Sequence, residues 1–119
     1  MFDFKDLNSA KDKAKDRDDK REHEADKAYH EAIELLNQLH KSPDFDLDLL
    51  RKAADKLVLS IKNKRNKAES YICLSNIFYI LDNIPAAIEH MKVAQSINPN
   101  LPGISKMQNL ISFGLPSGK

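Results

Sequence analysis

The chain has 119 residues, one cysteine and a net charge of +1, and hydrophobic and charged residues make up 41% and 31% of it. This composition favours a single water-soluble helical domain, and no apolar run approaches the roughly 18 residues that cross a bilayer. A net charge near zero gives no general attraction to nucleic acid. The N-terminal residues lack the apolar core of a signal peptide, and the lone Cys73 excludes an internal disulfide. We therefore expect a cytoplasmic protein.

Residues 1–24 form a charged N-terminal extension. Phe2, Phe4 and Leu7 lie among charged residues, which favours a loosely held terminus over a docking motif or a strap across the domain. Residues 8–24 are almost all charged, and only Ala10 and Ala14 are apolar. Because this stretch has almost nothing to bury, it is either a solvated helical extension or disordered.

Two amphipathic segments follow, over residues 25–40 and 47–61. Ser42–Asp46 separates them, and Asp46 is a suitable N-cap for the second. Apolar residues recur at helical spacing in both. The first stripe comprises Ala25, Ala28, Tyr29, Ala32, Ile33, Leu36 and Leu39, and the second comprises Leu49, Leu50, Ala53, Ala54, Leu57, Val58 and Ile61.

The stretch from Ala68 to Pro99 predicts a helical hairpin. Two apolar-striped segments flank a break at residues 82–85. Pro85 suits the first turn of the second helix, and Asn98-Pro99 ends that helix. The residues that share a face are Tyr71, Leu74, Ser75, Phe78 and Leu81 in the first segment, and Ala87, Ile88, Met91, Ala94 and Gln95 in the second.

This pattern resembles one tetratricopeptide repeat, a unit of about 34 residues. The unit runs aromatic-x-x-Leu-small-x-x-aromatic, then Ala-x-x-x-large, then Pro. Ser75 replaces the usual Gly, Met91 replaces an aromatic residue, and Asp82 stands where Gly is common.

Residues 27–61 resemble a first, looser repeat. Tyr29, Ala32, Ile33 and Leu36 align with Tyr71, Leu74, Ser75 and Phe78, and Ile33 departs from the pattern at the small position. Ala53, Leu57 and Ser60 align with Ala87, Met91 and Ala94.

A shorter apolar stripe over residues 104–111 predicts a terminal helix that covers the open end of the stack. The resemblance thus implies an all-α fold of two antiparallel helical hairpins plus a C-terminal capping helix. We place this domain at residues 25–112 and expect a flexible tail at residues 113–119.

Catalytic and metal chemistry find little support in the sequence. His23, Asp26 and His30 could share a helix face, but no third His or Cys is placed to complete a metal site. Cys73 lacks a recognisable His and acidic partner, which favours a buried, inert thiol. The C-terminal Gly-x-x-x-Gly-Lys has the wrong spacing for a phosphate-binding loop. We expect no enzymatic activity, no metal and no cofactor.

The resemblance implies a protein–protein interaction module or adaptor that binds a peptide or partner helix in a concave groove. The negative charge of Glu34 would repel the terminal carboxylate of a peptide, which argues against a groove that binds one. Ile72 and Tyr79 suggest an apolar anchor instead. By register the groove residues are Lys27, His30, Glu34 and Asn37 in the first repeat, and Glu69, Ile72, Asn76 and Tyr79 in the second.

Two alternatives use other surfaces. Lys62, Lys64, Arg65 and Lys67 form a basic patch that could contact nucleic acid, although the sequence favours a solvated loop. Two repeats are fewer than the usual three, and four apolar residues lie outside them. This predicts a self-assembling structural or secretion-type adaptor, most simply a two-fold homodimer. The four residues are Phe2, Phe4, Phe113 and Leu115.

Overall fold

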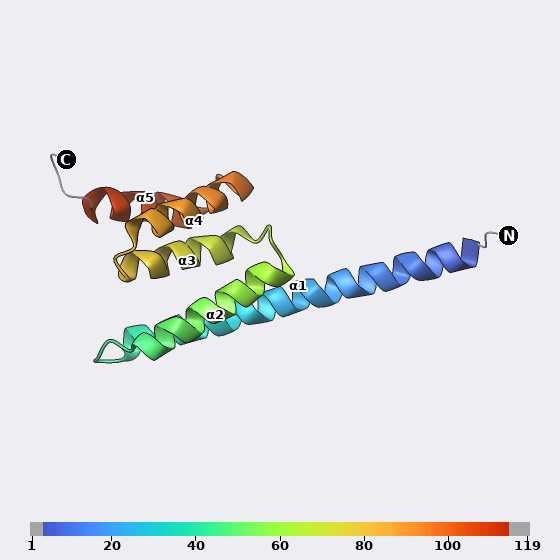
Figure 1. Cartoon of the computed structure of the whole chain (residues 1–119), viewed down its shortest axis with the longest axis horizontal. Coiled ribbons are helices and arrows are strands. Elements are labelled where there is room, and N and C mark those ends of the chain that lie inside the picture. Colours follow the sequence, from blue (N-terminus) through green and yellow to red (C-terminus); the bar gives the residue numbers. More distant parts are fainter. Residues whose placement is uncertain (1–3, 115–119) are drawn as a thin grey trace.

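The computed structural model describes the backbone of residues 4–114 and the side chains of residues 13–113 (Figure 1). Within the described residues the secondary structure is entirely helical, so the all-α prediction is confirmed. The helices are α1 (Phe4–Lys41), α2 (Leu47–Asn63), α3 (Ala68–Ile80), α4 (Ile84–Ile97) and α5 (Pro102–Gly114).

The helices pack in pairs. α1 pairs with α2 and α3 pairs with α4, while α5 packs on both α3 and α4 and α2 contacts α3. Successive helices run in opposite directions (Figure 1). The N-terminal half of α1 projects beyond all the other helices, which makes the molecule 71 Å long and only 19 Å across its shortest axis.

α1 is one continuous helix that includes the charged extension. Of the two alternatives that the sequence left open for residues 8–24, the structure has the helix. Side chains from Lys13 to Glu24 are exposed except for the half-buried Ala14, and Ala25 is the first buried residue in the described range. The amphipathic part of α1 therefore begins where the sequence predicted.

Small residues bring α1 and α2 together. Ala25, Ala28 and Ala32 are buried on α1, and Ala53 and Ser60 are buried on α2. The Lys56 ammonium pairs with the Glu31 carboxylate at 2.6 Å. Asp46 caps α2 as predicted, because its Oδ1 accepts hydrogen bonds from the backbone N–H groups of Asp48 and Leu49.

The alignment of the first pair on the second is only partly matched by burial. Ile33 is half-buried, whereas its aligned residue Ser75 is fully buried. The closest small residue on α1 is Ala32, which is fully buried. The small buried residue at this point of α1 is thus Ala32, one position before the position at which the repeat pattern has a small residue.

The α3–α4 hairpin closes through a helix-ending turn and a close helix contact. Asp82 has a left-handed backbone with φ of 61°, the conformation in which Gly is common. Asn83 caps α4 by accepting from the Ala86 N–H, with Pro85 in the first turn. The buried Ser75 hydroxyl donates to the Ala87 carbonyl at 2.6 Å, which requires the two backbones to approach closely.

α3 lies between two hydrophobic clusters. Ile72 packs with residues of α4 and α5, whereas Leu74 and Ile77 pack with residues of α1 and α2. Cys73 and Phe78 contact both clusters. All four other helices therefore contribute residues to a cluster that contacts α3. α3 thus fixes the position of the α1–α2 pair relative to α4 and α5.

α5 buries one face and exposes a polar one. Ile104, Met107 and Ile111 are buried against α3 and α4. The outward residues Ser105, Gln108, Asn109 and Ser112 are exposed and polar, as expected of a helix that ends a stack. The helix continues to Gly114, two residues past the predicted domain boundary. The rest of the predicted tail, residues 115–119, and the side chains of Phe2 and Phe4 lie outside the described residues.

Candidate partner-binding site

The four predicted groove residues of α1 are all exposed. Lys27, His30, Glu34 and Asn37 follow one another at three- and four-residue spacing, so they share one face of α1. The His30 ring meets the Tyr29 ring edge-on at 5.6 Å between centroids. This face of α1 is a polar surface with both signs of charge and is accessible to a partner.

The four predicted groove residues of α3 have different environments. Glu69, Asn76 and Tyr79 are half-buried, whereas Ile72 is 9% exposed and belongs to the core beneath α5. A Cβ atom at Gly103 of α5 would lie 3.2 Å from the Ile72 side chain. Ile72 is therefore mainly a packing residue. The sequence predicted a covering helix, but not that this helix would lie over Ile72.

A small pocket opens between α3 and α5 next to Asn76. Its volume is about 150 Å³, below the roughly 300–1,000 Å³ of typical small-molecule sites. It is sized for a side chain rather than a cofactor. The residues that line it are Ile72, Cys73 and Asn76 from α3, and Gly103, Lys106, Met107 and Leu110 from α5.

Lys106 and Leu110 were not among the predicted site residues. Both lie on α5 with four-residue spacing, so they share one face of this helix. Applying the groove register to this helix would have identified them. From the sequence we predicted only a terminal helix over residues 104–111, because this segment does not carry the repeat pattern.

Tyr29 and Cys73 connect α1 to α3 below this face. Burial raises the pKa of Tyr29 to about 12, and the neighbouring Cys73 thiol and the charge of Glu69 add to the effect. Burial also raises the pKa of the Cys73 thiol. A raised pKa keeps the thiol protonated, and therefore weakly nucleophilic, at neutral pH.

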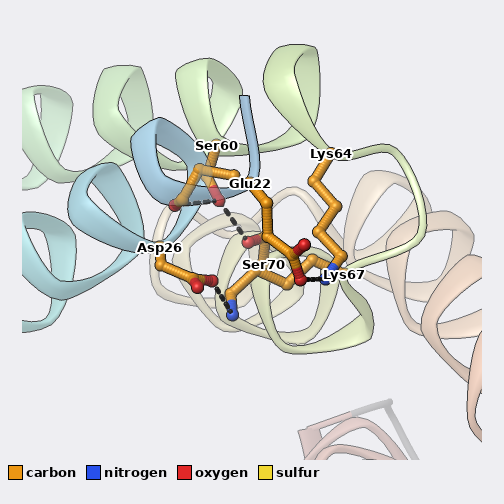
Figure 2. A network of polar contacts seen from close by, with 7 residues as sticks. Glu22, Asp26, Ser60, Lys64, Lys67 and Ser70 are labelled. Atoms are coloured by element: carbon orange, nitrogen blue, oxygen red, sulfur yellow. Dashed lines mark hydrogen bonds and ion pairs between the residues drawn. The ribbon is translucent and has the colours of Figure 1, made fainter. Parts of the chain in front are cut away.

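The predicted basic patch is partly neutralised by α1. The Lys64 ammonium lies 2.6 Å from the Glu22 carboxylate, and the Lys67 ammonium lies 2.9 Å from the Asp26 carboxylate (Figure 2). These contacts raise the pKa of Lys64 and lower that of Asp26. Lys67 also lies 4.7 Å from the centroid of the Tyr29 ring, a favourable cation–π geometry.

Lys62 and Arg65 differ from their two basic neighbours. Both are exposed, and neither forms an ion pair within the part of the chain whose side chains are described. Two charges thus remain available from the four that the sequence grouped together. The two neutralising acids are about 40 residues away in sequence, so the loop sequence alone does not indicate these ion pairs.

Two buried serines complete the junction between the helix pairs. The Ser60 hydroxyl donates to the Ala25 carbonyl at 2.8 Å and lies 2.9 Å from the Ser70 hydroxyl (Figure 2). Both serines are fully buried. Ser60 of α2 therefore connects α1 to α3, and together with the two ion pairs it fixes the loop between the pairs.

The described residues contain no cluster of three or more His, Cys, Asp or Glu side chains that could hold a metal ion. His23 and His30, the histidines considered above, are exposed. Within the same residues, no helix is long and apolar enough to cross a membrane.

Comparison with known proteins finds no matching family model, no matching curated protein and no matching solved structure.

Proposed function

We propose that this chain is a tetratricopeptide-type helical-repeat protein that binds a peptide or partner helix along the face formed by α1, α3 and α5. The repeat assignment is supported by burial at equivalent positions. Ala53, Leu57 and Ser60 on α2 are buried, and so are Ala87, Met91 and Ala94 on α4, each 34 residues later. That spacing is the length of the repeat.

The pocket between α3 and α5 is the observation that carries the binding proposal. It combines apolar walls from Ile72, Met107 and Leu110 with the Asn76 amide and the Lys106 ammonium. Neither polar group takes part in the hydrogen bonds or ion pairs of the described side chains. Apolar contact area with unused polar groups at its rim is typical of a peptide-anchoring site.

Tyr79 is the best test residue on this face. It is half-buried and packs against the α3–α4–α5 cluster through part of its ring, and tyrosine is enriched among residues that dominate interface energies. Tyr79→Ala should keep the fold and weaken partner binding by about 1–3 kcal/mol, roughly fivefold to more than a hundredfold in Kd.

The test uses peptides selected from a random library on the immobilised protein, with Kd measured by fluorescence anisotropy. Asn76→Ala should weaken binding in the same direction. Lys62→Ala with Arg65→Ala is the matched control, because these are the two basic-loop residues without ion pairs. If the control loses the selected peptides and Tyr79→Ala keeps them, the groove proposal is wrong and the basic loop is the site.

Self-association is a second candidate, and a specific observation favours it. Seven large apolar side chains in the described residues are exposed, by between 39% and 89%. The nucleic-acid alternative has less support, because Glu22 and Asp26 offset two of the four charges on which it rested.

A further inference from the structure

Five of the seven exposed large apolar residues belong to turns and helix ends that lie along one side of the molecule. The α1–α2 turn, the α3–α4 turn and the C-terminal end of α5 all reach the left edge of the stack in Figure 1. We name this set the turn-edge patch. It consists of Phe45, Leu47, Ile80, Leu81 and Phe113, of which Phe113 is 89% exposed.

Acidic residues lie in both turns of the turn-edge patch. Asp44, Asp48 and Asp82 are exposed, and the half-buried Asp46 is the cap of α2. None of these carboxylates forms an ion pair with a described side chain. The basic residues nearest to these aspartates in sequence are Lys41 and His40, in the last turn of α1. The edge is therefore apolar and predominantly negative.

The other two exposed apolar residues form a separate patch on α2. Val58 and Leu59 lie next to each other in the second half of the helix, and Lys62 follows one turn later. Arg65 comes in the following loop. Lys62 and Arg65 are exposed and form no ion pair with another side chain of residues 13–113, and together they outweigh the exposed Asp55 one turn earlier. We name Val58, Leu59, Lys62 and Arg65 the α2 patch.

We propose that the turn-edge patch of one molecule binds the α2 patch of a second copy, head to tail. Both patches are apolar and their surrounding charges have opposite signs, so this pairing buries apolar area while it brings carboxylates toward ammonium and guanidinium groups. A two-fold pairing of turn edges would instead place aspartates against aspartates, an arrangement that like-charge repulsion disfavours. The structure thus favours a different assembly from the two-fold dimer expected from the sequence.

The contact is of the heterologous kind, in which each molecule uses two different surfaces. Binding through one patch leaves the other patch of each molecule free, so the same contact can repeat into longer oligomers or close into a ring. The patches are small, and small interfaces are typical of weak, concentration-dependent association. This inference develops the self-association candidate and uses surfaces away from the groove, so it does not depend on the peptide-binding proposal.

The experiment uses sedimentation velocity on the full chain from low to high micromolar concentration. The wild type should show a mass that rises with concentration. Phe45→Ser with Phe113→Ser should abolish this rise, and so should Val58→Gln with Leu59→Gln, since each pair removes one of the two surfaces. Thermal unfolding followed by circular dichroism verifies that both variants are folded.

Mixing the two variants gives the decisive result. One intact patch remains on each, so an equimolar mixture should form a 1:1 heterodimer and nothing larger. Lys62→Glu with Arg65→Glu should weaken self-association, and a partner that carries Asp44→Lys with Asp48→Lys should restore it.

Three results would overturn the proposal. The first is a wild type that stays monomeric at high micromolar concentration. The second is an α2-patch variant that assembles like the wild type while the turn-edge variant does not, because turn edges would then pair with each other. The third is a mixture of the two folded variants that forms no heterodimer.

Discussion

Ser60 shows how one side chain joins both helix pairs. At the equivalent position of the second pair stands Ala94, so the repeat pattern demands only a small residue here. The hydroxyl nevertheless reaches the Ala25 carbonyl and the Ser70 hydroxyl in a fully buried site. Ser60 is therefore both a close-packing residue and a polar link between α1, α2 and α3.

Replacing Ser60 should reveal this link. Ser60→Ala leaves the buried Ser70 hydroxyl without its partner, which should lower the free energy of unfolding by about 1–3 kcal/mol. Adding Ser70→Ala should cost little more, because the orphaned group is then removed as well. Urea unfolding of the two single variants and the double variant measures the coupling. Full additivity of the two single effects would show that the serines do not act together.

Tyr29 should make stability depend on pH in the alkaline range. Its pKa is about 12 in the folded protein and about 10 in an unfolded chain. Below the unfolded value both states keep the phenolic proton and stability is unaffected. As the pH rises from about 10 to about 12, the unfolded chain ionises first, so the folded state loses relative stability.

The measurement compares Tyr29→Phe with the wild type by urea unfolding at several pH values. The difference in unfolding free energy between the two should stay constant below pH 10 and shift against the wild type between about pH 10 and 12. Subtraction removes the contribution of the Lys64–Glu22 pair, which titrates in both proteins. Tyr71→Phe is the control for loss of a phenol on α3, and a constant difference throughout would contradict the assigned environment of Tyr29.

α3 is the element on which the fold depends most. Its two faces serve two different clusters, and its contact with α4 is close enough for the Ser75 hydroxyl to reach the Ala87 carbonyl. A large or charged side chain at this contact has no space and no compensating partner. Substitutions there should therefore separate the helices rather than be absorbed locally.

Ala87→Arg should unfold the domain. Ala87 is fully buried, and an unpaired buried charge with the added bulk costs several kcal/mol. Leu74→Arg should also unfold the domain, because Leu74 is buried on the face of α3 that packs against α1 and α2. Glu89→Arg, at an exposed position of α4, is the matched control and should melt like the wild type. Circular dichroism melts decide the point, and a cooperatively folded Leu74→Arg protein would refute the register of α3.

At the scale of the whole molecule, the projecting part of α1 determines the length, whereas the core residues of α1 begin at Ala25. From Lys13 to Glu24 its side chains are exposed apart from the half-buried Ala14, and the ion pairs that join this end of α1 to the loop after α2 are those of Glu22 and Asp26 among the described side chains. Ion pairs on an exposed surface contribute little to stability. The projecting half of the helix should thus be separable from the folded domain.

Deletion of residues 1–19 should leave the melting temperature within a few degrees of the full chain, because Glu22, Asp26 and every residue that is buried in the described range 13–113 remain. The maximum dimension from small-angle scattering should fall by about 24 Å, since residues 4–19 are 16 helical residues that rise about 1.5 Å each. A larger drop in melting temperature would show that the extension packs on something, such as a second subunit.

The sequence alone determined the helices from Ala25 onward and most of their boundaries, but left open whether residues 8–24 are helical. Periodic apolar stripes, the Asp46 cap, the break at residues 82–85 and Pro99 are local signals, and each acts within a few residues of the position that it defines. The first buried position, Ala25, followed from the same reasoning, because charged residues with no apolar neighbours have nothing to bury.

Only the tertiary structure decided what those helices do to one another. In the folded protein α5 covers Ile72, and acids of α1 neutralise Lys64 and Lys67. Tyr29 of α1 lies next to Cys73 of α3. The turns and helix ends that carry five of the exposed apolar residues lie along one side of the molecule. Burial, pairing and patch formation depend on residues that are 30 to 70 positions apart in the chain. Helical periodicity shows which face of a helix is apolar, but the packing of helix on helix determines which part of that face stays accessible to a partner.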